Sequence, residues 1–284
     1  MFHIFGCPMH FGVGDNGLTY SLYYLNDYCQ NLDITMMPEI TMPEENLPNL
    51  KNLNSVIATC TQIAEKGYAA LERGNVPLFI AGDHSSVMGT VSASGTFYDD
   101  LGLIWIDAHP DINTDKTTVT GNIHGMPVAA LLGKGYDGLT KIFSDKIKVK
   151  PEHVVMLGLR DIDPPEAEIL KELKIKYYTY EDMKCIGIEA CVRESIEYLS
   201  HLSHVHISFD IDVMDPELLP GVSVPVPGGF YEAEAFDIMD MLIRGLPISS
   251  YDIVEFNAEH DKNDRTVKFA QKLVNFIMNT HRTK

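Results

Sequence analysis

The chain has 284 residues, of which 45% are hydrophobic and 22% charged, as is usual for a soluble globular protein. Its 40 acidic and 22 basic residues give a net charge of -18, which argues against nucleic acid and anionic membranes as partners, since both are bound through basic patches. No apolar run approaches the roughly 18 residues of a membrane span. The first residues lack the basic start of a signal peptide, so we expect a cytoplasmic protein. Five scattered cysteines without a CxxC pair predict reduced, mostly buried thiols.

Short apolar runs alternate with amphipathic stretches along the whole chain. The runs predict strands at residues 3–6, 77–81, 101–106, 154–159, 175–178, 205–209 and 250–254. The amphipathic stretches predict helices at residues 19–28, 50–72, 125–132, 165–173, 186–202, 232–243 and 262–279. A further helix is expected after residue 84, with Ser85 or Ser86 as its N-cap. This alternation predicts an α/β fold, a mostly parallel sheet with helices on both faces, in a single domain over residues 1–284.

Unusual polar residues follow the predicted strands. They are His84, Asp107, His109, Asp111, Arg160, Asp163, Asp210, Asp212 and Glu255. Taken singly, each is more often a turn, a cap or a hydrogen-bonded structural residue. Taken together they fall at the carboxyl ends of the strands, where ligands bind in open α/β sheets. The sequence therefore predicts one site at this edge.

The acidic and imidazole side chains of that edge predict a metal centre. Like charges in one site cannot all stay ionised without cations. Four carboxylates are balanced by two divalent ions, which in such sites lie about 3.5–4 Å apart. Oxygen and imidazole donors without thiolate favour Mn²⁺ over a zinc-thiolate site. A water held by two metals loses its proton near neutral pH, so the expected chemistry is metal-assisted hydrolysis.

Three motifs resemble those of the ureohydrolase family, and they occur in the family's order across essentially the whole chain. They are Gly-Asp-His-Ser at 82–85, Asp-Ala-His-Pro-Asp at 107–111, and Ser-Phe-Asp-Ile-Asp followed by Asp-Pro at 208–216. The resemblance implies a three-layer fold and a binuclear manganese centre. One Mn²⁺ would take His84, Asp107, Asp111 and Asp210. The other would take His109, Asp107, Asp210 and Asp212.

The resemblance also implies a mechanism. A hydroxide bridging the two metals would attack the guanidinium carbon, and the tetrahedral intermediate would collapse to urea and an amine. His124 resembles the family's proton-shuttling histidine. Glu255 resembles the acid that pairs with the guanidinium group, and Asp111 is counted with these two as catalytic. The structural alternatives are a helix-start residue for His124 and an edge ion pair for Glu255.

Two loops are similar to those of the arginases within the family. By this similarity Asn113, Thr120 and Asn122 would hold the α-carboxylate of arginine, while Asp163 and Glu166 would meet its α-amino group. Their structural alternatives are loop capping and a charge at a helix N-terminus. L-arginine is therefore the expected substrate, with urea and L-ornithine as products. The family resemblance also implies a homo-oligomer, a trimer or hexamer, although no residue of this chain fixes the number.

One residue departs from the arginase pattern. Val224 stands where arginases carry a threonine hydroxyl that helps to orient the guanidinium-binding acid. Losing one hydrogen bond to a charged group costs about 1.5–3 kcal/mol, which corresponds to roughly 10- to 100-fold in rate. Two alternatives therefore stay open: a ureohydrolase acting on agmatine or another guanidino compound, and an inactive metal-binding relative with a regulatory role.

Overall fold

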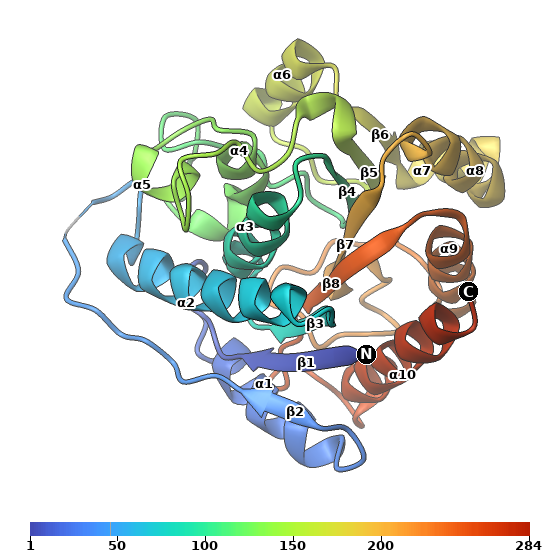
Figure 1. Cartoon of the computed structure of the whole chain (residues 1–284), viewed down its shortest axis with the longest axis horizontal. Helices are drawn as coiled ribbons and strands as arrows, with labels where there is room; N and C mark the ends of the chain where they lie inside the picture. Colours follow the sequence, from blue (N-terminus) through green and yellow to red (C-terminus); the bar gives the residue numbers. More distant parts are fainter. Residues whose placement is uncertain (46) are drawn as a thin grey trace.

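The computed structural model describes residues 1–45 and 47–284, and its strands form one parallel sheet (Figure 1). The strand order is β2-β1-β3-β8-β7-β4-β5-β6, and every pair of neighbours runs parallel. The strands are β1 (Phe2–Cys7), β2 (Ile34–Met36), β3 (Val76–Ala81), β4 (Leu101–Ile106), β5 (Val154–Leu159), β6 (Lys176–Thr179), β7 (His204–Asp210) and β8 (Ile248–Val254). The parallel sheet expected from the sequence is confirmed.

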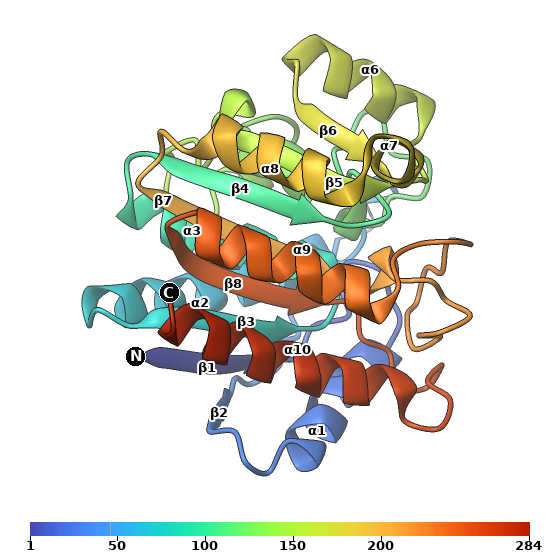
Figure 2. The same cartoon turned by 90° about the vertical axis from the view of Figure 1, so that its right-hand side faces the viewer.

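Helices cover both faces of this sheet. The α-helices are α1 (Gly17–Tyr28), α2 (Leu53–Glu72), α3 (Val87–Phe97), α4 (Pro127–Leu131), α5 (Asp137–Thr140), α6 (Pro164–Leu173), α7 (Tyr180–Ile186), α8 (Ile188–Leu199), α9 (Glu232–Gly245) and α10 (Arg265–Arg282). Figure 2 shows α8, α9 and α10 lying side by side across one face, with α2 and α3 behind the sheet. The layers are thus helix, sheet and helix.

Two apolar cores fill the spaces between these layers. Successive residues of a strand point to opposite faces, and β4 follows that rule: Ile104 and Ile106 pack with α8, α9 and α10, whereas Leu103 and Trp105 pack with α2, α3 and α4. All six residues of β4 are buried, because this central strand has helices on both sides. The continuous apolar run that predicted a buried strand therefore has a direct structural cause.

The structure corrects three details of the predicted elements. The helix expected at residues 186–202 is α8, and a separate helix, α7, precedes it, because Gly187 adopts a φ of 108° that ends α7. The short elements β2 and α5 were not expected. The serine cap predicted after β3 is confirmed in position only: Ser86 is the N-cap residue of α3 but its side chain makes no cap hydrogen bond, whereas Asp83 accepts the Ser85 N–H.

The predictions about the cysteines and about membrane-spanning segments can be compared with the structure. All five cysteines are free thiols, and four of them are buried, with Cys185 exposed. Among the described residues, no helix combines the length and the apolar character that crossing a membrane requires.

Candidate metal centre and substrate pocket

The site lies at the carboxyl ends of four neighbouring strands, β3, β8, β7 and β4. His84 follows β3, Asp107 follows β4, Asp210 ends β7, and Glu255 follows β8. Parallel strands bring all of their carboxyl ends to one edge of the sheet, so residues up to 171 positions apart in the sequence come into contact there. The strand-end site predicted from the sequence is thus built by the sheet order.

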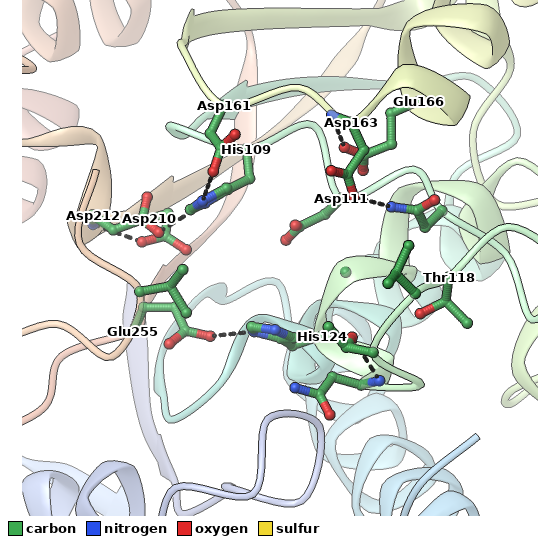
Figure 3. Close-up of a pocket in the computed structure, with 16 residues that line it drawn as sticks. His109, Asp111, Thr118, His124, Asp161, Asp163, Glu166, Asp210, Asp212 and Glu255 are labelled. Atoms are coloured by element: carbon green, nitrogen blue, oxygen red, sulfur yellow. Dashed lines mark hydrogen bonds and ion pairs between the residues drawn. The ribbon is translucent and has the colours of Figure 1, made fainter. Parts of the chain in front are cut away.

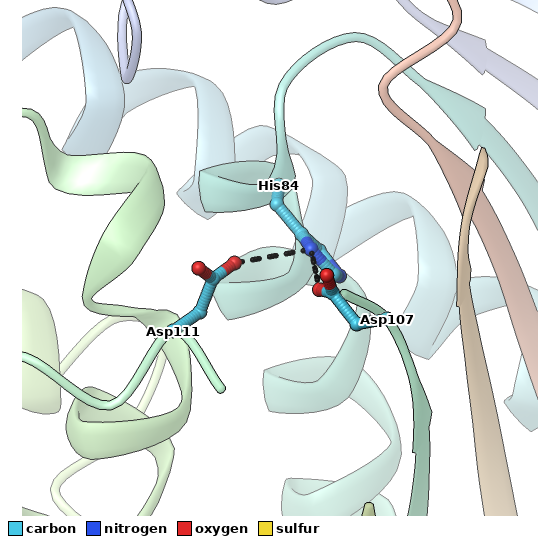
Figure 4. A group of neighbouring side chains, drawn as sticks. All are labelled: His84, Asp107 and Asp111. Atoms are coloured by element: carbon cyan, nitrogen blue, oxygen red, sulfur yellow. Dashed lines mark ion pairs between the residues drawn. The ribbon is translucent and has the colours of Figure 1, made fainter. Parts of the chain in front are cut away.

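The first ligand cluster is centred on the buried imidazole of His84 (Figure 4). Its Nδ1 lies 2.9 Å from an Asp107 oxygen, 3.1 Å from an Asp111 oxygen and 3.0 Å from an Asp210 oxygen. Within the described chain, His84 Nδ1 and Asp107 Oδ2 are buried and have no aligned hydrogen bond. Donor atoms that converge in this way without bonding one another are suited to a cation at their centre.

The second cluster consists of Asp107, His109 and Asp212. His109 Nδ1 lies 3.0 Å from Asp212 Oδ2 and 3.5 Å from Asp107 Oδ1. Asp107 therefore offers one carboxylate oxygen to each cluster. Asp210 stands between the clusters as well, since its Oδ2 faces His84 and its Oδ1 accepts the Asp212 N–H at 2.7 Å.

Electrostatics support a cation at this place. Burial and the neighbouring carboxylates raise the pKa of Asp210, and the same two causes outweigh His109 in raising that of Asp212. Burial would lower the pKa of His84, but the three carboxylates around its Nδ1 raise it well above its ordinary value. Without a cation, the centre would thus have to hold protons. Buried oxygen and imidazole donors without thiolate fit Mn²⁺.

Two residues that the sequence reasoning missed hold the His84 ring. The ring stacks on Trp105, with centroids 3.9 Å apart and planes 5° apart, and its Nε2 lies 2.9 Å from Ser208 Oγ. A proton on Nε2 would be donated to Ser208 and leave Nδ1 free for a metal. A signal was present, because Trp105 and Ser208 each lie two residues before a ligand aspartate and so share its strand face.

Glu255 is held in an unusual conformation. Its φ is 64°, and Asp111 has a φ of 46°, both in the left-handed region that non-glycine residues rarely adopt. Glu255 Oε1 accepts the His84 N–H at 2.8 Å and lies 3.5 Å from His124 Nδ1. Its Oε2 is buried and has no hydrogen-bond partner in the described part of the chain. Such backbone conformations concentrate at functional sites, where the surrounding structure enforces them.

A cavity of about 230 Å³ has four residues of the candidate ligand set in its lining: His109, Asp111, Asp210 and Asp212 (Figure 3). It is lined by His109, Asp111, Asn113, Thr118, Val119, Thr120, Asn122, His124, Gly125, Asp161, Asp163, Glu166, Asp210, Asp212, Val224 and Glu255. Eleven of the thirteen site residues named from the sequence are in this set, and the other two, His84 and Asp107, are buried in the candidate ligand clusters. Thr118 and Asp161 line the cavity although they were not predicted, and each lies two residues from a predicted residue.

The residues expected to bind the amino-acid end lie in the cavity and also have structural partners. Asn113 donates to Asp163 at 3.4 Å, and Thr120 Oγ1 accepts the Asn122 N–H at 3.1 Å. Glu166 accepts the Asp163 N–H at 3.0 Å as part of the N-terminus of α6. Burial, and then the charge of Asp111, raise the pKa of Glu166 to about 8. These contacts are compatible both with the capping alternatives and with a polar subsite.

Comparisons with known proteins agree with this geometry. The model of the Arginase family matches residues 11–279. A Bacillus subtilis arginase is 36% identical over 97% of this chain and 96% of its own length, and its crystal structure superposes with a TM-score of 0.87 over 98% of both chains. A Bacillus caldovelox arginase is 38% identical over 85% of this chain and 81% of its own length. The structure of an Entamoeba histolytica arginase in complex with L-ornithine has a TM-score of 0.90 at 27% identity, covering 98% of both chains.

Proposed function

The chain belongs to the arginase family, and we propose that it hydrolyses the guanidinium group of L-arginine to urea and L-ornithine with two Mn²⁺ ions. The observation that carries this proposal is the pair of ligand clusters that share Asp107 beneath a polar cavity. The family relationship over nearly the whole chain supports the same reaction class.

The donor atoms fit two manganese ions. We assign His84, Asp107, Asp111 and Asp210 to one ion, and His109, Asp107, Asp210 and Asp212 to the other. When bound, the two ions would supply a nucleophile by lowering the pKa of a coordinated water. Buried aspartates with raised pKa values release their protons when cations bind, so metal loading also prepares the site for a cationic substrate.

Glu255 and His124 perform the remaining chemistry in this proposal. The Glu255 carboxylate faces the cavity and would pair with the guanidinium group, holding it over the ligand clusters. Burial lowers the pKa of His124, but its hydrogen bond to Glu255 raises it, and the net shift is upward. That shift favours the imidazolium form, which can donate a proton to the leaving amine.

The far part of the cavity would bind the amino-acid end. Amide and hydroxyl groups of Asn113, Thr120 and Asn122 are suited to a carboxylate, because they donate hydrogen bonds without adding negative charge. Asp163 and Glu166 are acceptors suited to an ammonium group. This polarity favours a zwitterionic substrate over agmatine, which lacks the carboxylate.

The assembly and the compartment remain parts of the proposal. We propose a homo-oligomer, a trimer or hexamer by family resemblance, located in the cytoplasm. Neither nucleic acid nor membrane is proposed as a partner, in keeping with the net charge of -18.

The test is a paired urea assay on protein loaded with Mn²⁺. We expect urea release from L-arginine to have a higher kcat/KM than urea release from agmatine. Faster turnover of agmatine would favour the agmatinase alternative. Two bound metals per chain without hydrolysis of any guanidino compound would favour an inactive relative.

A further inference from the structure

The lining of the cavity is rich in acidic side chains. Its lining includes seven carboxylic acids and contains neither lysine nor arginine: Asp111, Asp161, Asp163, Glu166, Asp210, Asp212 and Glu255. The acids next to the metal ligands would be balanced by bound cations. Asp161 and Asp163 are not among the assigned ligands and would repel the α-carboxylate of an amino acid, so an anionic group needs positive charge nearby.

Lys51 lies at the rim of the cavity, beside the lining residue Asn122. It is exposed and comes two residues before the start of α2. Its Nζ donates to Oδ1 of the cavity residue Asn122 at 3.1 Å, and its backbone N–H donates to the Gly121 carbonyl at 3.0 Å. The ammonium group therefore reaches the rim of the cavity from outside its lining.

The position of Lys51 is fixed by the packing of two loops. Gly121 has a φ of 74°, and a Cβ on it would lie 1.9 Å from the Pro48 carbonyl oxygen, so this close approach requires glycine. Asn49 donates to the Asp115 carbonyl at 3.0 Å, which ties the same two loops together at a second point. The segment before α2 thus packs against the loop that contains Asp115 and Gly121, which we call the rim loop.

We propose that Lys51 is a specificity-determining residue that favours substrates with an α-carboxylate. An ammonium group needs an acceptor, so its contact fixes Asn122 with Oδ1 toward Lys51 and leaves the two N–H donors of the amide for a ligand. Lys51 also adds a positive charge next to these donors. The substrate class is therefore a guanidino amino acid rather than a guanidino amine. This inference rests on the proposed function, because it names the substrate of that same site.

The test compares ligands with and without a carboxylate in wild type, K51M and K51R. For turnover the pair is L-arginine and agmatine. For binding, measured by calorimetry on Mn-loaded protein, the pair is L-ornithine and 1,4-diaminobutane. An exposed charge contact contributes up to about 1 kcal/mol, so K51M should raise KM for arginine and Kd for ornithine by up to about fivefold.

K51M should leave kcat for arginine unchanged. It should not raise KM for agmatine or Kd for 1,4-diaminobutane. K51R should retain most of the wild-type preference. K116M is the matched control, because Lys116 is an exposed lysine of the same rim loop and donates no side-chain hydrogen bond to the cavity lining as described.

Two results would overturn the proposal. One is a K51M variant in which KM or Kd rises equally for both ligands of a pair, which would point to a structural role. The other is an equal effect of K116M, which would point to general surface charge. If wild-type protein releases no urea from arginine, the proposed function fails, while the ornithine and diaminobutane affinities still decide whether Lys51 selects carboxylates.

Discussion

At the scale of single residues, the most informative atom is Glu255 Oε2, which is buried without a hydrogen-bond partner in the described chain. Val224 lines the same cavity and carries no hydroxyl. A buried acceptor without a partner is unfavourable, and for a charged group the cost is larger. The departure from the arginase pattern and this unpaired oxygen of the residue assigned to the guanidinium group thus belong to the same cavity.

Val224→Thr should supply the missing donor. We expect kcat/KM for arginine to rise by about tenfold, since an added hydrogen bond to a charged group is worth about 1.5 kcal/mol at the lower end. Steady-state urea assays would measure the change. Val224→Ala is the control, because it alters the side-chain volume without adding a donor. A rise of the same size in both variants would contradict the hydrogen-bond explanation.

Asp210→Ala removes a carboxylate that stands between both clusters. We expect activity to fall by more than about 100-fold, because losing even an indirect metal partner costs 10- to 100-fold. The metal content, measured by elemental analysis, should fall below that of wild type. Asp240→Ala is the control, since Asp240 pairs with Arg244 on α9. Wild-type turnover and metal content in D210A would refute the ligand assignment.

At the scale of elements, periodicity predicted most strands and long helices, because their apolar faces are buried and repeat regularly. It failed where local geometry decides: Gly187 separates α7 from α8, and β2 has only three residues. The site was predictable where ligand types follow strands. Ser208 and Trp105 were missed because a serine and a tryptophan within strands carry no distinctive chemistry until the strand order is known.

One loop joins several parts of the site. Gly12 donates its N–H to Asp83 Oδ2 at 2.9 Å and accepts the His124 N–H at 3.3 Å. A Cβ on Gly12 would lie 2.4 Å from Asp83 Oδ1 and 2.5 Å from Ser85 Oγ. The loop between β1 and α1 thus connects the His84 segment to the His124 segment.

Gly12→Ala should push the loop between β1 and α1 away from Asp83 and Ser85. We expect a loss of about 1–3 kcal/mol in the free energy of unfolding, measured by urea denaturation, and a lower kcat as His124 shifts. Gly14→Ala is the control in the same loop: it has the backbone strain of a φ of 84°, but no atom lies within 4 Å of the added Cβ. Equal loss of activity in both variants would contradict a specific role for Gly12.

At the scale of the whole molecule, the metal centre links folding to pH. Without metal, the pKa values of His84, His109, Asp111, Asp210 and Asp212 are all raised. At these five groups the folded protein then binds more protons than the unfolded chain above about pH 4, where carboxylates ordinarily titrate. Their contribution to the free energy of unfolding should therefore fall as the pH rises. The pKa of Asp107 is lowered, so this residue affects the free energy of unfolding only at acidic pH.

Manganese should reverse this trend. Binding requires deprotonated ligands, so the affinity for Mn²⁺ rises with pH. At a free Mn²⁺ concentration of a hundred times Kd, each occupied site adds about 2.7 kcal/mol to the free energy of unfolding. The difference in Tm between Mn-loaded and chelator-treated protein should therefore widen from about pH 6 to about pH 8. Calorimetric scans would measure it. A difference that is constant or narrows over this range would contradict the linkage.

The stacking of Trp105 on His84 gives the protein a built-in optical reporter. The chain contains a single tryptophan, and besides this stacking its indole N–H donates to the His109 carbonyl at 3.0 Å. All indole fluorescence therefore originates beside two of the assigned ligands. Paramagnetic Mn²⁺ should quench the Trp105 fluorescence on binding, so metal occupancy can be followed in unlabelled protein. A titration that left the emission unchanged would place the metal elsewhere.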